Sequence, residues 1–313
     1  MTEQQENKQV TQVLPSWVAK LRPLMSVLAS ISPKLVSRFI AVSWFKPFMP
    51  AAKKHVKAWQ ATADEYIKLT KGEAFIFNGD NSGVDETRNN GNDQLDKSAK
   101  PLVVCVHGWR GRAFQMRRFL SPLHAQGFRV AIVNLPAHTD QDVNFTHGFE
   151  CADFLVELKN KCGEIDSIIA HSFGCPVSTL ALSDNFKLRK LVYIAGNFNI
   201  QYLLQQVCAA FDIQSIYSQV EQQVKLSCDR KIYPGSWDDF QAEKFIQQLQ
   251  FAEQIMFYHD PKDSEICIKT NDQIYAAIKP TGKAQIKNVT GVGHFDILRS
   301  QAIIDDICRY ICD

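Results

Sequence analysis

The sequence predicts an α/β protein in which a mostly parallel central sheet is flanked by helices. Short apolar runs alternate along the chain with segments whose apolar residues recur at helical spacing. The apolar runs are continuous, which is typical of strands that are buried on both faces of a parallel sheet. The 313 residues, 45% of them hydrophobic, are enough to build one large domain of this kind.

The predicted elements follow one another in a regular order. A strand at 73–77 leads into a polar segment, 78–100, which we expect to be a surface loop. Helical spacing is clear between 114 and 123, where Gly127 ends the pattern, and again between 149 and 158. Residues 197–250 break the alternation, so we expect a small helical cap there. Further strands are expected at 101–106, 129–133, 165–169, 188–195, 254–258 and 284–286.

Residues 1–65 are predicted to form a basic amphipathic helical arm that precedes an α/β domain at 66–313. Between Asn7 and Ala63 the chain has nine lysines and arginines and neither aspartate nor glutamate. Two interpretations remain open. A basic amphipathic helix can lie on an anionic membrane surface. The same helix can instead pack on the α/β domain, or at a dimer interface, and expose its lysines to water.

The most informative segment is 170–174, Ala-His-Ser-Phe-Gly, which lies between an apolar run and the start of a helix. A serine flanked two residues away by small residues, between strand and helix, is the nucleophile-elbow pattern. The sharp turn holds the serine hydroxyl out of the sheet, and large side chains at 170 or 174 would collide with neighbouring backbone. The pattern makes Ser172 a candidate nucleophile.

A serine hydroxyl is a poor nucleophile until a base accepts its proton, and an imidazole suits that role. His294, which follows the predicted strand at 284–286, is the candidate base. The base in turn needs a carboxylate to fix its tautomer. Asp260 and Asp263, just after the strand at 254–258, both qualify. Serine, aspartate, histidine is also a known chain order of catalytic triads.

From about residue 73 onward the chain resembles the α/β-hydrolase superfamily, and it looks closest to compact bacterial serine hydrolases with a short helical cap. Ala170 stands where a glycine is usual, and Asn134 and Thr139 also depart from the family pattern. The segments that carry the resemblance are 107–109 (His-Gly-Trp), 135–138 (Leu-Pro-Ala-His), 170–174, 259–263 (His-Asp-Pro-Lys-Asp) and 293–294 (Gly-His).

This resemblance implies a triad of Ser172, Asp263 and His294, because Asp263 lies at the offset from the strand end where the family carries its acid. Asp260, which precedes a proline, is then expected to cap the turn. The resemblance also implies an oxyanion hole made by the backbone N–H groups of Trp109 and Phe173.

The expected function is hydrolysis of a carboxylic ester or thioester through an acyl-enzyme, with no cofactor and no metal. A serine at the nucleophile position excludes the haloalkane dehalogenase and epoxide hydrolase chemistry of this fold, which uses a carboxylate there. Two alternatives remain. One is a catalytically idle scaffold that acts as a binding protein, and the other is a cofactor-free peroxidase or acyltransferase that uses the same triad.

Bulk properties and the remaining polar residues limit the partners. A net charge of +2 gives no reason to expect nucleic acid, so the expected partner is a small ester or thioester. His107, His138 and His171 are expected to be structural, whereas Arg110 and Arg112 either favour an acidic substrate or face water. Nine cysteines, an odd number, favour buried thiols. We therefore expect a cytoplasmic protein, with peripheral contact at the inner membrane surface if the arm binds lipid.

Overall fold

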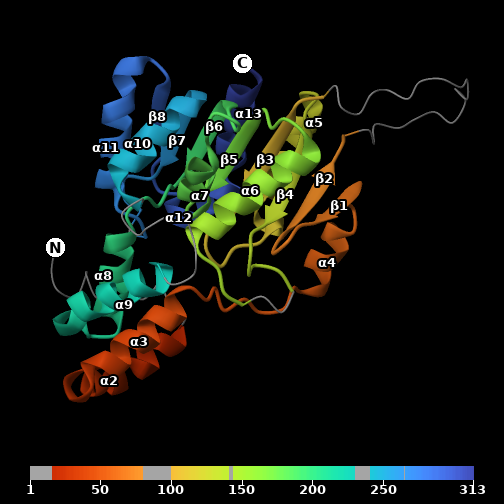
Figure 1. Cartoon of the computed structure of the whole chain (residues 1–313). Helices are drawn as coiled ribbons and strands as arrows, with labels where there is room; N and C mark the ends of the chain where they lie inside the picture. The colour runs from red at the N-terminus through yellow and green to blue at the C-terminus, as the bar shows by residue number, and fades with distance from the viewer. Residues whose placement is uncertain (1–15, 80–99, 141–143, 230–239, 264) are drawn as a thin grey trace, which may run out of the picture.

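A computed structural model describes residues 16–79, 100–140, 144–229, 240–263 and 265–313. Most of the expected loop at 78–100, the first fifteen residues of the arm and ten residues of the expected cap lie outside these ranges. The centre of the molecule is an eight-stranded sheet with the order β1-β2-β4-β3-β5-β6-β7-β8 (Figure 1). The strands are β1 Glu65–Lys68, β2 Glu73–Phe77, β3 Leu102–Val106, β4 Arg129–Asn134, β5 Ser167–His171, β6 Leu188–Ile194, β7 Ala252–His259 and β8 Ala284–Asn288.

Six neighbouring strands of the sheet, β4, β3, β5, β6, β7 and β8, run parallel to one another, which confirms the predicted fold class. β3 and β5 are buried along their whole length, as their continuous apolar runs predict. β1 pairs antiparallel with β2, and β2 pairs antiparallel with β4. The sequence analysis missed β1 because this edge strand has four residues, three of them exposed, and so has no apolar run.

Helices cover both faces of the sheet, and each face has its own apolar cluster. Side chains from α6, α7, α10 and α11 pack on one face, while α5, α13 and a 3-10 helix at Ala113–Phe119 pack on the other. Figure 1 shows α6 in front of the sheet and α13 behind it. The helical stripe at 114–123 therefore forms the 3-10 helix followed by a short α5. The helices are α5 Leu120–Ala125, α6 Gly148–Cys162, α7 Gly174–Ala181, α10 Ala242–Gln248, α11 Ile268–Ile278, α12 Gly293–Asp296 and α13 Gln301–Cys312.

A third apolar cluster joins the arm to the cap. It contains one face of α2 (Ser16–Ile31) and α3 (Pro33–Trp44) together with α8 (Ile200–Ala210) and α9 (Tyr217–Asp229). Figure 1 places α2 and α3 at the end of the molecule farthest from the sheet, with α9 between them and the rest of the chain. None of the helices in the described ranges is long and apolar enough to cross a bilayer.

The last helix of the arm packs against the sheet and not against the cap. α4, Lys54–Gln60, places Trp59 with its ring centroid 6.2 Å from that of Phe75 and 5.5 Å from that of Phe77, both on β2. Trp59 therefore belongs to the apolar cluster behind the sheet. The residues before 65 thus contact two different parts of the protein, because the apolar side chains of α4 face β2 and those of α2 and α3 face the cap.

Replacing Trp59 by alanine should destabilise the sheet end of the molecule. The side chain is half-buried against aromatic rings, so we expect a loss of about 2 kcal/mol in the free energy of unfolding. Urea unfolding monitored by circular dichroism measures it. Lys54→Ala, an exposed position on the same helix, is the control and should change stability by less than about 0.5 kcal/mol. Equal stabilities of the two variants would show that α4 contributes nothing to the sheet.

Candidate active site

Ser172 occupies the tight turn between β5 and α7, and its backbone is in the left-handed region with φ of 53°. A non-glycine residue in this region is strained and persists only where surrounding contacts hold it. Here the amide of Ser172 donates to the carbonyl of Ile194 at 2.9 Å, and its carbonyl accepts from the amide of Asn197 at 3.2 Å. The end of β6 therefore holds the turn in place.

Two glycines let other backbone segments approach this turn. A Cβ added to Gly108 would lie 2.8 Å from the Cβ of Ser172, closer than real Cβ contacts occur. A Cβ added to Gly174 would lie 2.8 Å from the carbonyl oxygens of both Val106 and His107. The loop after β3 thus packs directly on the start of α7, and this contact explains the small residue expected at position 174.

The structure brings Ser172, His294 and Asp263 into one hydrogen-bonded chain. The Nε2 atom of His294 lies 2.9 Å from the Oγ of Ser172, and its Nδ1 atom lies 2.8 Å from an Oδ2 of Asp263. All three residues are buried, with between 7% and 8% of their surface exposed. Nδ1–H donates to the carboxylate, so Nε2 is free to accept the serine proton.

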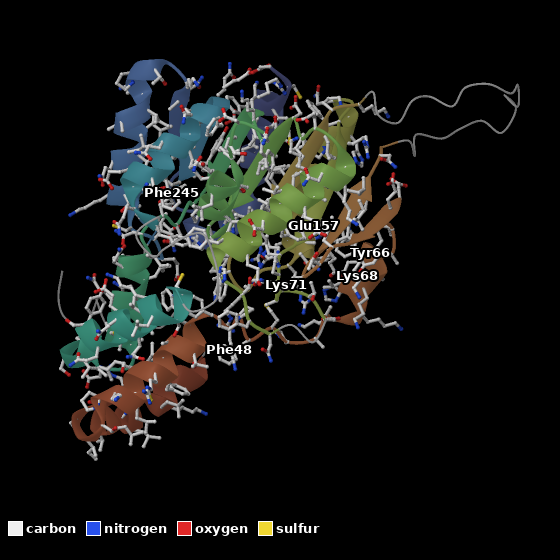
Figure 2. All side chains as sticks on the ribbon, in the orientation of Figure 1. Phe48, Tyr66, Lys68, Lys71, Glu157 and Phe245 are labelled. Atoms are coloured by element: carbon white, nitrogen blue, oxygen red, sulfur yellow. The ribbon has the colours of Figure 1, made fainter. Side chains whose placement is uncertain are left out.

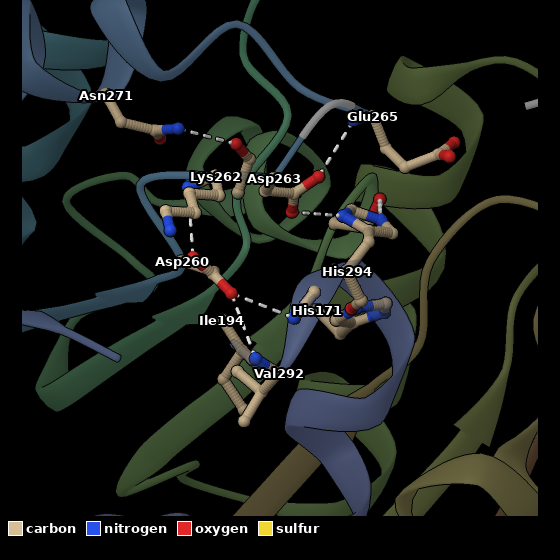
Figure 3. Close-up of polar contacts among 12 residues, drawn as sticks. His171, Ile194, Asp260, Lys262, Asp263, Glu265, Asn271, Val292 and His294 are labelled. Carbon is tan, nitrogen blue, oxygen red and sulfur yellow. Dashed lines mark hydrogen bonds and ion pairs between the residues drawn. The ribbon is translucent and has the colours of Figure 1, made fainter. Parts of the chain in front are cut away.

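Asp260 and Asp263 have different partners, as Figure 3 shows. Asp263 uses its second oxygen to accept from the amide of Glu265 at 2.8 Å. Asp260 accepts from the amides of Val292 and Gly293, both at 3.0 Å, and not from an imidazole. Burial raises the pKa of Asp260, but the backbone hydrogen bonds outweigh this and hold its pKa below the usual value. Asp260 therefore fixes the loop that carries His294.

His171, beside the serine, supports the same loop. Its Nε2 atom lies 2.9 Å from the carbonyl oxygen of His294, and the two imidazole rings are 4.9 Å apart. Burial, with a smaller contribution from the neighbouring His294, lowers the pKa of His171 to about 3. The imidazole is therefore neutral and donates its Nε2–H to that carbonyl, which is a structural role.

His107 and His138 bind two loops together above the sheet. The Nε2 atom of His107 accepts from the amide of Leu135 at 3.1 Å, and that of His138 accepts from the amide of Arg110 at 3.1 Å. In each ring Nδ1–H donates to a nearby carbonyl, that of Gly108 and that of Pro136 respectively. Both rings must be neutral to accept in this way. Burial lowers the pKa of both, for His138 to about 4.

These contacts position the loop that holds Trp109 beside the start of α7. The rings of Trp109 and Phe173 meet edge to face, with their centroids 5.1 Å apart. Within the described residues, neither of the two backbone N–H groups donates to a protein acceptor. Each amide is therefore available as a donor, as the expected oxyanion hole requires.

A cavity of about 700 Å³ adjoins Ser172 and His294. Leu203 and Val207 of α8, which lies in the segment expected to be a cap, form part of its wall. Sequence reasoning missed the contribution of the arm, which adds Phe39, Val42 and Phe48. The helical spacing of α3 showed that it has an apolar face, but no local pattern indicates which distant element that face meets.

The charged residues near the cavity differ in their environments. Arg110 lines the cavity, whereas Arg112 donates to the Oδ1 atom of Asp140 at 3.0 Å and to the carbonyl of Pro50, away from it. Glu265, which the sequence analysis did not single out, also lines the cavity, and burial raises its pKa. In the described part of the chain, no cluster of three or more histidine, cysteine or acidic side chains is placed to hold a metal ion.

Comparison with known proteins identifies one matching family model. Residues 103–302 match the alpha/beta hydrolase family. The match spans the loop of Trp109, the Ser172 turn, both aspartates and His294. No curated protein matches the sequence.

Solved structures with the same fold include enzymes of different activity. An esterase of Pyrococcus furiosus aligns with a TM-score of 0.58 and 13% identity over 84% of this chain and 97% of its own. The thioesterase domain from the curacin biosynthetic pathway aligns with a TM-score of 0.51 and 13% identity over 80% and 98%. A haloalkane dehalogenase loop variant from Bradyrhizobium elkanii aligns with a TM-score of 0.51 and 12% identity over 79% and 95%. Identities this low show the fold and not the reaction.

The neutral state of His138 predicts a specific pH dependence of stability. Because its pKa is about 4 in the folded protein against 6.5 in the unfolded chain, the unfolded chain binds more protons between these values. Stability should therefore fall as the pH drops, and this residue alone should remove about 2 kcal/mol between roughly pH 7 and pH 5. Urea unfolding of the parent and of His138→Gln, each at pH 7 and at pH 5, measures the contribution of this residue, since glutamine does not titrate. An unchanged pH dependence in the variant would contradict the neutral assignment.

Proposed function

Because this chain belongs to the alpha/beta hydrolase family, we propose that it is a serine hydrolase that cleaves a carboxylic ester or thioester through an acyl-enzyme. The observation that carries the proposal is the hydrogen-bonded chain from Ser172 Oγ through His294 to Asp263. An imidazole aligned between a hydroxyl and a buried carboxylate is the arrangement that activates a serine.

In the proposed reaction the Oγ of Ser172 attacks the acyl carbonyl while Nε2 of His294 accepts the hydroxyl proton. The negative charge of Asp263 stabilises the imidazolium and keeps the ring in the required tautomer. The backbone N–H groups of Trp109 and Phe173 donate to the oxyanion of the tetrahedral intermediate. His294 then protonates the leaving alcohol or thiol. Water, activated by the same imidazole, hydrolyses the acyl-enzyme and frees Ser172.

The cavity supports a substrate with an apolar acyl group. Aliphatic and aromatic side chains of α3 and α8 form one part of its wall. The polar residues that line it are Ser43, Lys46, Arg110, Gln115, Thr146, His147, Ser172, Asn197, Glu265 and His294. Apolar walls bind a hydrocarbon chain without leaving polar atoms unpaired. The bond cleaved, ester or thioester, depends on the leaving group, and both leave through protonation by His294.

The competing hypothesis is a catalytically idle scaffold, and a fluorophosphonate probe distinguishes it from a hydrolase. A fluorophosphonate probe labels a serine only where a base activates it. Labelling of the parent protein and not of Ser172→Ala supports the hydrolase. A panel of p-nitrophenyl esters and acyl-CoA thioesters of graded chain length then defines the substrate. Absence of both labelling and hydrolysis would reject the proposed function in favour of a binding protein.

We expect Ser172→Ala to fold normally and to lose ester hydrolysis by a factor of around 10⁶, because removal of a triad serine leaves only binding and oxyanion contacts. Steady-state kinetics with p-nitrophenyl butyrate measure the loss, and circular dichroism checks the fold. Activity within tenfold of the parent would show that another group is the nucleophile.

Asp263→Asn should be far more damaging to turnover than Asp260→Asn. An amide at position 263 can hold His294 in the wrong tautomer, which costs about 10⁴ in turnover in the best-studied triad. Asp260 bonds only to backbone amides, so an asparagine there should mainly lower the thermal stability of the loop at 291–294. Turnover and melting temperature are measured for both variants at neutral pH. The reverse ranking in turnover would mean that Asp260 is the acid.

A further inference from the structure

The arm has an apolar face that the rest of the described protein leaves uncovered. Exposed large apolar side chains on α2 recur at positions 24, 27 and 31, and those on α3 at 35, 39 and 42, so each set forms one stripe along its helix. Between 47% and 74% of each side chain is exposed. With Phe48, these residues are seven of the nine large apolar side chains exposed in the described chain. We call them the outer face of the arm: Leu24, Val27, Ile31, Leu35, Phe39, Val42 and Phe48.

Every charge on the same part of the chain is positive. From residue 16 to residue 63 the sequence has lysines and arginines and no acid. Lys20 is four residues before Leu24 on the stripe of α2, while Lys34 and Arg38 are adjacent to the stripe of α3. These three residues are exposed, and none has a carboxylate partner among the residues that the structure describes. An apolar stripe edged by unpaired cations matches the two attractions of an anionic lipid surface.

The outer face continues into the cavity of the candidate active site. Phe39, Val42 and Phe48 are exposed on this face and also line the cavity that contains Ser172 and His294. Figure 2 shows Phe48 where the chain leaves α3 toward the body of the protein. Lys46, between Val42 and Phe48, lines the cavity too. A hydrocarbon chain can therefore pass from the outer face toward the serine along apolar side chains.

We propose that the outer face of the arm docks on an anionic membrane surface and that the hydrolase takes an acyl ester directly from that membrane into its cavity. The substrate part of this inference rests on the proposed function, whereas the docking part does not. Leu24, Val27, Ile31 and Leu35 enter the headgroup region, and Lys20, Lys34 and Arg38 pair with lipid phosphates. The proposed contact is peripheral, through the exposed side chains of α2 and α3.

Charge favours a lipid surface over a second copy of this chain. A symmetric dimer through the outer face would place the same surface against itself. That contact would bring the unpaired cations at its edge toward their own copies, and like charges that face each other are unfavourable. A bilayer that contains anionic lipid instead provides the opposite charge beside the apolar interior that the stripe requires.

Docking is tested by vesicle sedimentation with the Ser172→Ala protein, so that lipid is not consumed and the result does not depend on the chemistry. One set of vesicles is phosphatidylcholine alone, and the other contains roughly one third phosphatidylglycerol. We expect binding to the second set only, and weaker binding as salt rises from about 0.1 M to about 1 M, because screening shortens the reach of the lysines. No sedimentation with anionic vesicles, or equal sedimentation with both sets, would overturn the docking.

Two groups of substitutions separate the apolar and the charged contributions. Val27→Gln, Ile31→Gln and Leu35→Gln together should lower the vesicle partition coefficient by about tenfold or more, since the stripe no longer favours the headgroup region. Lys34→Glu with Arg38→Glu should lower it by a similar factor on anionic vesicles. The charge-matched control is Lys187→Glu with Lys269→Glu, exposed positions on the α/β domain, which should bind within about twofold of the parent.

Folding and oligomerisation are checked on the same proteins. Circular dichroism should show native helix content, because the substituted side chains are exposed. Sedimentation velocity should show the same mass for parent and variants. A dimer that the glutamine substitutions dissociate, with vesicle binding unchanged, would overturn the proposal and identify the outer face as a contact between copies.

Delivery of substrate is tested with the active enzyme on two substrates. A long-chain p-nitrophenyl ester is placed in the anionic vesicles, and p-nitrophenyl butyrate is supplied in water. The triple glutamine variant should hydrolyse the vesicle-borne ester about tenfold more slowly and the soluble ester at the parent rate, because none of its three positions lines the cavity. Equal rates on the vesicle-borne ester would overturn delivery from the membrane. If the parent protein does not hydrolyse the soluble ester at all, the proposed function is rejected, but the docking result still stands.

Discussion

The left-handed turn at Ser172 is the constraint on which the rest of the site depends. Its φ of 53° is costly for a residue with a side chain, so neighbouring elements must hold it from several sides. The end of β6 supplies backbone hydrogen bonds to the turn, and the loop after β3 reaches it only because position 108 is glycine. All of these contacts lie at the carboxyl ends of parallel strands, where ligand sites of open α/β sheets are found.

Buried neutral histidines stabilise this end of the sheet. His107 and His138 each accept from one backbone amide and donate to one carbonyl, and His171 donates to the carbonyl of His294. An amide proton cannot bond to a protonated ring nitrogen, so the two loops held by His107 and His138 are intact only while those rings are neutral. His107, His138 and His171 therefore hold backbone segments, whereas His294 faces the hydroxyl of Ser172.

The cavity joins two apolar clusters with different origins. The triad belongs to the sheet, but much of the wall belongs to the cluster formed by the arm and the cap. Because α2 and α3 use one face to pack on α8 and α9, the opposite face is left to solvent along both helices. The arm thus contributes at once to the wall of the cavity and to an uncovered apolar surface, and this connection underlies the proposed delivery of substrate from a membrane.

The sequence by itself determined the parallel sheet, because strands buried on both faces must be continuously apolar. Short local patterns singled out Ser172 and His294 and left Asp260 and Asp263 as alternative acids, of which the resemblance to the α/β-hydrolase superfamily favoured Asp263. The structure brings the side chains of Ser172, His294 and Asp263 within hydrogen-bond distance of one another. It also shows that Asp263 contacts the imidazole of His294 whereas Asp260 contacts backbone amides. This difference depends on where the loop at 291–294 lies, and composition and spacing left it open. The edge strand β1 escaped detection because its exposed residues follow no apolar period. Only the tertiary structure decided that α3 lines the cavity and that α4 joins the sheet, because the helical spacing of apolar residues specifies that a face is buried and carries no information about which distant surface buries it.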